Sequence, residues 1–405
     1  AITSTVVEDN EAGDDGGGLF SCCDGLLSVT DSLIRNNKTT ASGDEGGGLY
    51  RCCGSLATIK DSTISDNSAN TEGGGIFSCC GGNLTITNTT VSDNTAVEEG
   101  GGVYVCCGSQ LDLNSSTLSG NSADRGGGIW SSAGGDVIGT NCTISGNSST
   151  TSGGGFEGST TANTTFQNST IVNNTSATGG GIMLDVDAGA DTTLVNTIIA
   201  SNNPADCSGD SSPTSGDNNL DSDGSCSLGM ASDLSGTDPL LGVLGDNGGD
   251  TETHLPAATS PVIDAGSLTN CPSTDQRSIG RPLDGEADGS TACDIGAVEK
   301  SLLNVELLKL IRSAKKLLKK VRPGVKKLSK KTKAVNSKLS EIVTFIDNFQ
   351  DRIETDPESA KLGKLAKTAR KRVKSAVKNV AAGDFASRKT SANKALTRLQ
   401  AVVKR

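Results

Sequence analysis

Apolar and polar residues alternate in short runs along residues 1–203, and turns rich in Gly, Asn and Asp separate the runs. One run recurs as DSTISDN, NTTVSDN, SSTLSGN, NCTISGN and NSTIVNN, beginning at residues 61, 88, 115, 141 and 168. β-branched residues between turn residues indicate strands, and no helical period accompanies them. We therefore predict that this part of the chain is all β.

The runs return at a nearly constant interval. Glycine triplets begin at residues 16, 46, 73, 100, 126, 153 and 179, so successive repeats are 26 to 30 residues long. This period is typical of a solenoid, in which each repeat forms one coil and stacking buries a continuous core. Three aliphatic rows predict three strands per coil around a triangular core. The rows are Leu19, Leu49, Ile76, Val103 and Ile129; Val29, Ile59, Ile86 and Leu113; and Ile34, Ile64, Val91, Leu118, Ile144 and Ile171.

An asparagine closes each coil. These residues are Asn37, Asn67, Asn94, Asn121, Asn147 and Asn174. Stacked amides can hydrogen-bond along the solenoid axis, and Asn tolerates left-handed backbone geometry at a turn. We interpret this asparagine ladder as structural.

All thirteen cysteines precede residue 300, and eight form vicinal pairs at one place in four successive coils. The pairs are Cys22 and Cys23, Cys52 and Cys53, Cys79 and Cys80, and Cys106 and Cys107. Parallel strands stack about 4.8 Å apart, which suits the Cα separation of a disulfide. We favour disulfides between coils, such as Cys22–Cys52 and Cys79–Cys106 or their vicinal partners, each contributing about 3 kcal/mol. Vicinal disulfides and a soft-metal site are the alternatives, and the lack of accompanying His disfavours metal.

The remaining cysteines have local partners or none. Cys207 with Cys226 and Cys271 with Cys293 are expected to form local disulfides, and Cys142 is interpreted as a small core residue.

An aromatic row follows the first aliphatic row by one residue. Its members are Phe20, Tyr50, Phe77, Tyr104 and Trp130. Alternation along a strand places this row on the outer face, where exposed rings could bind glycan or form a protein interface. The alternative is that the rings stack on one another and only shield the sheet.

The GGG-aliphatic-aromatic and STISxN patterns resemble the repeats of secreted right-handed parallel β-helix proteins, including relatives of polymorphic outer-membrane proteins. Further motifs, such as DNGGDTETH at 246–254, SPVIDAG at 260–266 and CDIGAVE at 293–299, resemble the C-terminal module of choice-of-anchor Q proteins. The resemblance covers roughly residues 1–299. It implies a right-handed parallel β-helix over 1–203, a capping module over 204–299 and an exported protein, and it implies no known reaction.

The chain departs from that family pattern at both ends. STVVEDN at 4–10 already matches the middle of a repeat, so we expect an upstream cap to be missing. The chain begins with Ala1 and shows no signal peptide, which suggests a processed chain. The segment after Glu299 is neither a simple transmembrane anchor nor a sorting motif.

Residues 300–405 have a different composition, poor in Gly and rich in Leu, Lys, Ala and Val. Apolar residues step by 3 and 4 from Leu303 to Val321 and from Val325 to Ile353, which predicts an α-helical bundle of three or four helices. Lys and Arg cover its outer faces. The residues expected to bind a polyanion are Lys315, Lys316, Lys319, Lys320, Lys326, Lys327, Lys330, Lys331, Arg370, Lys371 and Arg372.

Charge divides between the two parts of the chain. Residues 1–300 contain eight Lys/Arg and 39 Asp/Glu, for a formal charge of −31, whereas residues 301–405 contain 28 and eight, for +20. The basic part therefore implies an anionic partner, either the acidic coils of another copy or an acidic cell-surface polysaccharide. Nucleic acid is disfavoured because the basic part has few aromatics and no binding motif. No apolar run is long enough to span a membrane.

Cofactors and catalysis find little support in the sequence. Asp185 with Asp187, and Asp217 with Asp221 and Asp223, could hold a structural Ca²⁺ but match no full loop motif. The basic residues of the coils do not recur as a cluster, and the single histidine, His254, lies in the capping module, where we expect a structural role. We predict no catalytic residue and no enzyme activity.

The sequence as a whole favours an extracellular structural protein, secreted or at the cell surface, that self-assembles into a filament, sheath or surface layer. A monomeric adhesin that binds glycans is the alternative, followed by a polysaccharide lyase or hydrolase.

Overall fold

The computed structural model describes residues 1–23, 25–159, 161–185, 191–285 and 291–300. The chain divides into two units, Ala1–Lys300 and Ser301–Arg405. The predicted helical bundle and its polyanion-binding residues lie outside the described residues, so they stay predictions. Among the residues that are described, no helix has the length and apolar character of a membrane span.

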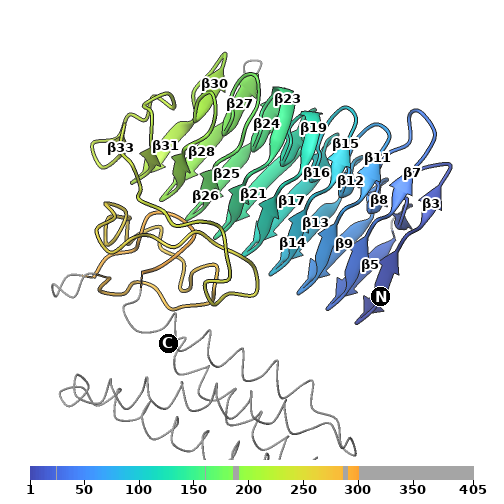
Figure 1. Cartoon of the computed structure of the whole chain (residues 1–405), viewed down its shortest axis with the longest axis horizontal. Helices are drawn as coiled ribbons and strands as arrows, with labels where there is room; N and C mark the ends of the chain where they lie inside the picture. The colour runs from blue at the N-terminus through green and yellow to red at the C-terminus, as the bar shows by residue number, and fades with distance from the viewer. Residues whose placement is uncertain (24, 160, 186–190, 286–290, 301–405) are drawn as a thin grey trace, which may run out of the picture. The chain divides into compact units, whose positions relative to one another are not determined.

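The first unit is a stack of parallel strands in four sheets (Figure 1). Sheet A contains β1 (Ile2–Thr3), β5 (Leu26–Thr30), β9 (Leu56–Lys60), β13 (Asn83–Thr87), β17 (Gln110–Asn114), β21 (Asp136–Thr140), β25 (Thr164–Gln167), β28 (Thr192–Val195) and β31 (Thr214–Asp217). Sheet B contains β2 (Val6–Glu8), β6 (Leu33–Arg35), β10 (Thr63–Ser65), β14 (Thr90–Ser92), β18 (Thr117–Ser119), β22 (Thr143–Ser145), β26 (Thr170–Val172), β29 (Ile198–Ala200), β32 (Leu220–Asp221) and β33 (Leu234–Ser235). Sheet C contains β3 (Glu11–Ala12), β7 (Lys38–Thr39), β11 (Ser68–Ala69), β15 (Thr95–Ala96), β19 (Ser122–Arg125) and β23 (Ser148–Ser152). Sheet D contains β4 (Leu19–Ser21), β8 (Leu49–Arg51), β12 (Ile76–Ser78), β16 (Val103–Val105), β20 (Ile129–Ser131), β24 (Phe156–Ser159), β27 (Ile182–Asp185) and β30 (Cys207–Gly209).

Each early coil passes through sheets A, B, C and D in that order. The prediction of three strands per coil is therefore wrong for the coils that contain a strand of sheet C. These strands were missed because their inward residues are small: Ala69, Ala96 and Ala123 are buried, but they do not read as an aliphatic row. Later coils omit sheet C and have the three predicted strands.

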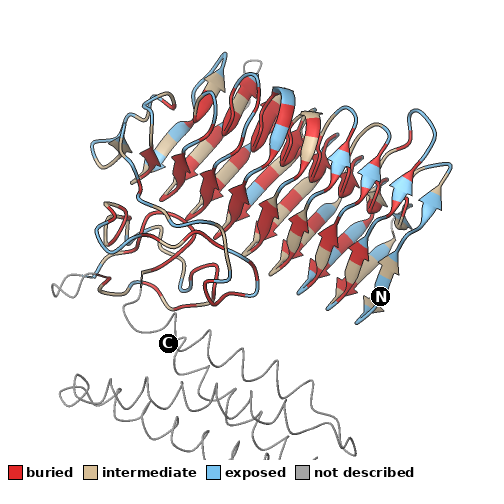
Figure 2. Cartoon of the chain, in the orientation of Figure 1, coloured by how far each residue is buried: buried red, intermediate tan, exposed pale blue. Residues whose placement is uncertain are grey.

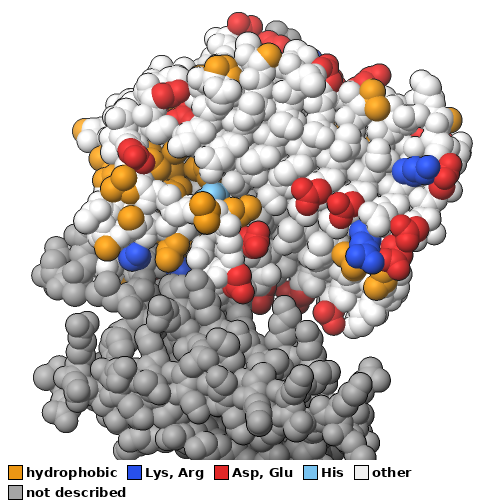
Figure 3. Space-filling view, in the orientation of Figure 1, with side chains coloured by type: hydrophobic (Ala, Val, Ile, Leu, Met, Phe, Trp, Pro, Cys, Tyr) orange, Lys and Arg blue, Asp and Glu red, His pale blue; other side chains and the backbone are white. Residues whose placement is uncertain are grey.

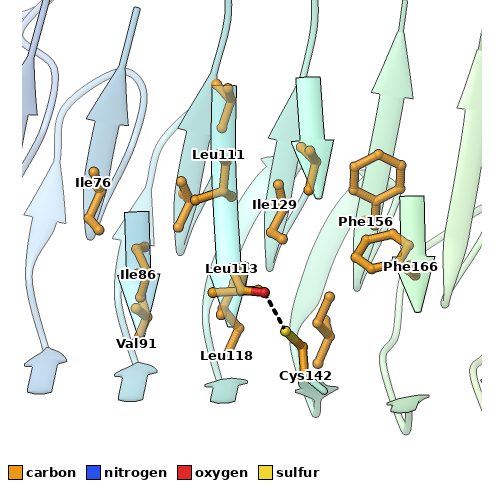
Figure 4. Close-up of a cluster of buried hydrophobic side chains, with 14 of the residues drawn as sticks. Ile76, Ile86, Val91, Leu111, Leu113, Leu118, Ile129, Cys142, Phe156 and Phe166 are labelled. Carbon is orange, nitrogen blue, oxygen red and sulfur yellow. Dashed lines mark hydrogen bonds between the residues drawn. The ribbon is translucent and has the colours of Figure 1, made fainter. Parts of the chain in front are cut away.

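The three predicted aliphatic rows lie in register inside the coils. Ile76 pairs with Leu49 and Val103 in sheet D, and Ile64 pairs with Ile34 and Val91 in sheet B. The rows merge into one continuous core in which most side chains are fully buried (Figures 2 and 4). Because the coils stack in register, the remaining residues of each coil, including those on the outer faces, also line up from coil to coil.

The coil continues beyond the predicted boundary at residue 203. Strands β30 to β33 extend three of the sheets as far as Ser235. Residues 236–285 and 291–300, which we call the side module, then return along the outer face of sheet B (Figure 1). The side module packs Val262 and Ile295 against Val172 and Ile198. The predicted capping module therefore consists of a few last coils and a lateral segment.

Polar bonds also attach the side module to sheet B. Thr117 Oγ1 donates to the carbonyl of Glu252, and Thr143 Oγ1 donates to Gln276 Oε1 at 2.7 Å. His254 is buried, with Nε2 2.8 Å from Ser145 Oγ and Nδ1 2.7 Å from the carbonyl of Gly242. Burial lowers the pKa of His254 below its usual value. These contacts place His254 in the packing between sheet B and the side module.

Candidate functional site

The asparagine ladder is continuous through the coils. Each side-chain Nδ2 donates to Oδ1 of the next asparagine, as from Asn67 to Asn94 and from Asn94 to Asn121, both at 2.9 Å. The backbone N–H of each asparagine donates to the same oxygen at 2.9 to 3.0 Å. Left-handed geometry falls on the residue before the ladder position, such as Asp66 with φ 57° and Asp93 with φ 57°. The ladder asparagines themselves do not adopt that conformation.

A second ladder, of hydroxyl groups, lies at the turn between sheets A and B and escaped the sequence reasoning. Its members are Ser32, Ser62, Thr89, Ser116, Ser169 and Thr197. Each hydroxyl accepts from the backbone N–H of the equivalent residue one coil earlier, and all are buried. Cys142 occupies this position in one coil, where its Sγ donates to the carbonyl of Leu113 at 3.0 Å (Figure 4). Cys142 is therefore a sulfur analogue of the ladder hydroxyls.

The aromatic row stacks on the outer face of sheet D. Phe20, Tyr50, Phe77 and Tyr104 follow one another with ring centroids 5.0 to 5.1 Å apart and nearly parallel planes. The side chain of Arg125 lies 4.3 Å from the ring centroid of Trp130.

The expectation of an exposed aromatic row is wrong for most of its length. Phe77, Tyr104 and Trp130 are 4%, 8% and 3% exposed, whereas Phe20 is 59% exposed. Stacking covers both faces of the inner rings, and Cys79 and Cys106 pack beside them in the same cluster. The row acts as a second, external hydrophobic core.

Glutamates line the aromatic row on its other side. The backbone of Glu99 forms parallel β-bridges with Glu72 in one neighbouring coil and with Arg125 in the other. Burial, and then the charge of Glu72, raises the pKa of Glu45 and of Glu99 to about 7. Burial also raises the pKa of Glu72. We call Glu45, Glu72 and Glu99 the carboxylate row.

The vicinal cysteines form two groups of four at one corner of the coils. Cys22, Cys23, Cys52 and Cys53 are the first cysteine cluster, and Cys79, Cys80, Cys106 and Cys107 are the second. The Sγ atoms of Cys22 and Cys52 lie 2.7 Å apart, as do those of Cys79 and Cys106.

The structure brings the predicted inter-coil pairs Cys22–Cys52 and Cys79–Cys106 together at 2.7 Å without closing a disulfide bond. The local disulfides Cys207–Cys226 and Cys271–Cys293 are formed. In each cluster, three sulfur atoms lie within 4.8 Å of one another: Cys22, Cys52 and Cys53 in the first, and Cys79, Cys106 and Cys107 in the second. The second residue of every pair is exposed.

Arg51 lies inside the coil beneath this corner and is fully buried. Its Nε donates to the carbonyl of Ser55 at 2.8 Å, and its Nη1 donates to Ser78 Oγ at 2.8 Å and Ser109 Oγ at 3.2 Å. Its Nη2 also donates to the carbonyl of Gly81. Burial lowers the pKa of Arg51. Sequence reasoning missed this residue because a single Arg at a strand position gives no signal.

The aspartates considered for calcium do not gather into one open site. Asp221 is buried and accepts from the backbone N–H groups of Cys226 and Gly236. Asp223 accepts from Asp206 and Ser225, and Asp185 faces Arg125. Asp187 lies outside the described residues.

An acidic groove crosses the part of sheet B that the side module leaves open. Its volume is about 400 Å³, and it is lined by Asp31, Asp61, Ser62, Thr63, Asn88, Thr90 and Asp250. The three aspartates are exposed, and acidic side chains outnumber basic ones across the face in Figure 3. We call this feature the acidic groove.

Residues 2–138 match the family model described as a right handed beta helix region. The coils up to Ser235 form the parallel β-helix that this family model describes. No curated protein and no solved structure matches it significantly. The match begins in β1 and ends in β21, so it covers the coils that carry the cysteine clusters and the whole aromatic row. The further coils of this β-helix protein are recognised from their strand pairing.

Proposed function

We propose that this β-helix protein is an exported structural protein that associates with copies of itself at the cell surface as a filament, sheath or surface layer. In this proposal, Lys and Arg of residues 301–405 in one copy bind the acidic groove of another. The resemblance of residues 1–299 to choice-of-anchor Q proteins supports export. Basic motifs in residues 301–405, such as KKLLKKVR at 315–322, supply the complementary positive charge.

The observation that carries the proposal is the unbalanced charge of the β-helix surface. Residues 1–300 have a formal charge of −31, and most of their few cations are already engaged. Arg35 and Lys38 pair with Glu8 and Glu11, and Arg125 pairs with Glu157.

Most of the other basic side chains of residues 1–300 are buried or hydrogen-bonded within the unit. Arg277 pairs with Asp275 and Arg281 with Glu299, with all four side chains buried, and Lys300 donates to a backbone carbonyl. Asp31 and Asp61 of the groove accept hydrogen bonds from the neutral side chains of Ser4 and Asn88, so their negative charge can attract an external polycation. A polycation binds most strongly because it engages several carboxylates at once.

Glycan adhesion along the aromatic row receives no support, because only the Phe20 end of that row is well exposed. The family includes enzymes as well as non-enzymes, and the prediction of no enzyme activity stays a prediction. Product release from acidic glycans would contradict it.

Association of the full-length chain should depend on salt. Surface ion pairs are screened over about 3 Å at 1 M ionic strength and over about 30 Å at 0.01 M. Sedimentation velocity should therefore show assemblies at low salt and monomers at high salt. Monomers at low salt would refute the proposal.

Charge-matched variants test the groove itself. The triple variant Asp31→Asn, Asp61→Asn, Asp250→Asn should weaken association about tenfold, from three ion pairs of about 0.5 kcal/mol each. The control Asp14→Asn, Glu98→Gln, Asp210→Asn alters three exposed acids elsewhere and changes net charge equally. Equal weakening by both variants would show that net charge, and not the groove, drives association.

A further inference from the structure

The eight clustered cysteines are not required by the corner that they form. Val105 pairs with Ser131, so Ser132 and Ala133 take the places of a vicinal pair in the next coil. Ala133 has φ 48°, close to the 57° of Cys107, and the backbone turns in the same left-handed way. Because the fold makes this corner without sulfur, the thiols need another explanation.

The sulfur atoms of each cluster converge, and an ion bound among them would move apart the two that lie 2.7 Å from each other. Three of the four in each cluster lie within 4.8 Å of one another, from two successive coils. The inner residues Cys52, Cys79 and Cys106 are buried, while the outer residue of each pair is exposed. Each cluster thus has a protected interior and an open side through which an ion could enter.

Arg51 supplies a second, independent observation. It is buried between the two corners, beside Cys52 and bonded to Gly81 and Ser109, which follow the pairs of the second cluster. Its partners are hydroxyls and backbone carbonyls, and no ion pair includes Arg51 within the described part of the chain. The other fully buried arginine, Arg277, pairs with the buried carboxylate of Asp275.

A buried cation without a counter-charge is costly, so an anionic group is expected near Arg51. Disulfides are neutral and would leave the charge unbalanced, although the short Cys22–Cys52 and Cys79–Cys106 separations suit them as well. A metal held by several thiolates carries net negative charge. The charge of Arg51 and the convergence of a third sulfur therefore favour metal.

We propose that each cysteine cluster binds one soft monovalent cation of the Cu(I) type through three thiolates. Thiolates select soft ions, and no imidazole or carboxylate belongs to either cluster. Structural Zn²⁺ takes four ligands in a tetrahedron, whereas only three sulfurs of each cluster lie within 4.8 Å of one another. The fourth sulfur approaches one of the three, Cys23 at 3.2 Å from Cys22 and Cys80 at 3.1 Å from Cys79. Each ligating thiol releases its proton to solvent and no electron is transferred, so a Cu(I) ion with three thiolates leaves a centre of charge −2. This proposal does not depend on the assembly proposed above.

Anaerobic titration of the full-length chain with Cu(I), against a chelator of known affinity, tests the proposal. Thiolate-to-copper absorption should saturate at two ions per chain. The variant Cys52→Ser with Cys53→Ser should bind one ion, and so should Cys106→Ser with Cys107→Ser. Cys142→Ser, which removes a buried thiol outside both clusters, should still bind two.

Arg51→Met should weaken binding about tenfold, through loss of the neighbouring positive charge. Circular dichroism shows whether that variant is folded, and the cluster variants keep the proposal testable if it is not.

Three results would overturn the proposal. The first is recovery of the eight cysteines as disulfides when native protein is alkylated at harvest and its mass is measured. The second is Cu(I) binding that the cluster variants leave unchanged. The third is preferential binding of Zn²⁺ by four thiolates of a cluster.

Discussion

Replacing one asparagine in the middle of the asparagine ladder should destabilise the coils on both sides of it. Asn94 is fully buried, and its Oδ1 accepts from the backbone N–H of Asn67 at 3.0 Å and from Asn67 Nδ2 at 2.9 Å. Its own Nδ2 donates to Asn121 Oδ1 at 2.9 Å and to the carbonyl of Ile64 at 3.1 Å. Asn94→Ala removes all four bonds.

The expected cost follows from the groups left without partners. The backbone N–H and one amide hydrogen of Asn67 lose their acceptor in a site that the coils close to water, at about 1–3 kcal/mol each. Adding the small cavity, the loss is about 3–5 kcal/mol. Asn83→Ala, at an exposed position that begins β13, should cost less than about 0.5 kcal/mol.

Hydrogen exchange monitored by mass spectrometry is the direct assay, because a solenoid is stabilised by contacts between neighbouring coils and loses protection locally. Peptides that contain Asn67 and Asn94 should exchange about a hundredfold to a few thousandfold faster in Asn94→Ala. Peptides from β28 and β29 should change little. If Asn94→Ala and Asn83→Ala exchange alike, the ladder does not stabilise the coils.

Three further predictions follow from burial and packing. Burial raises the pKa of Glu99 to about 7, so the folded chain binds more protons than the unfolded chain between about pH 4.5 and 7. The free energy of unfolding therefore falls as pH rises through that window. Glu99→Gln should raise the free energy of unfolding by about 1 kcal/mol at pH 8, after allowance for solvent screening, and should leave it unchanged near pH 4. Denaturant midpoints would check this, with the exposed Glu98→Gln as the control and a pH-independent gain as the contrary result. Gly101→Ala places a Cβ 2.4 Å from the carbonyl oxygen of Ser122 and should cost more than about 3 kcal/mol in thermal unfolding, whereas Gly229→Ala, with nothing within 4 Å, should be nearly neutral. Gln276→Ala removes the hydrogen bonds of its Nε2 to Thr117 and Thr251 and of its Oε1 to Thr143. Protease cleavage within 236–300 should therefore accelerate about tenfold. If Gln276→Ala is cleaved no faster than the control Thr259→Ala, apolar packing alone holds the side module.

The repeat was readable from the sequence because its signals are periodic. The inward rows through Ile64, Ile76 and Ile86 follow from spacing alone, since every coil repeats the same aliphatic positions. Sheet C was missed because its inward residues are alanines such as Ala69, which resemble loop residues. The hydroxyl ladder was missed for the same reason, since Ser62 and Thr89 read as ordinary turn residues.

Other features depend on contacts that a periodic pattern does not contain. Alternation correctly placed Phe77 and Tyr104 on the outer face of sheet D, but their burial comes from stacking and from the neighbouring cysteines. The path of the side module rests on single bonds to residues more than a hundred positions away, such as Gln276 with Thr143. Arg51 is recognisable only once its position inside the coil is known.

The side module has a mechanical consequence. A simple solenoid pulled from its ends would unravel one turn after another, since each turn is held only by its neighbours. Here a single returning segment is bonded to Thr117, Thr143 and Thr170, which belong to three successive turns. Force applied to that stretch must detach the segment before any of the three can unwind, so these turns should give way together in one step.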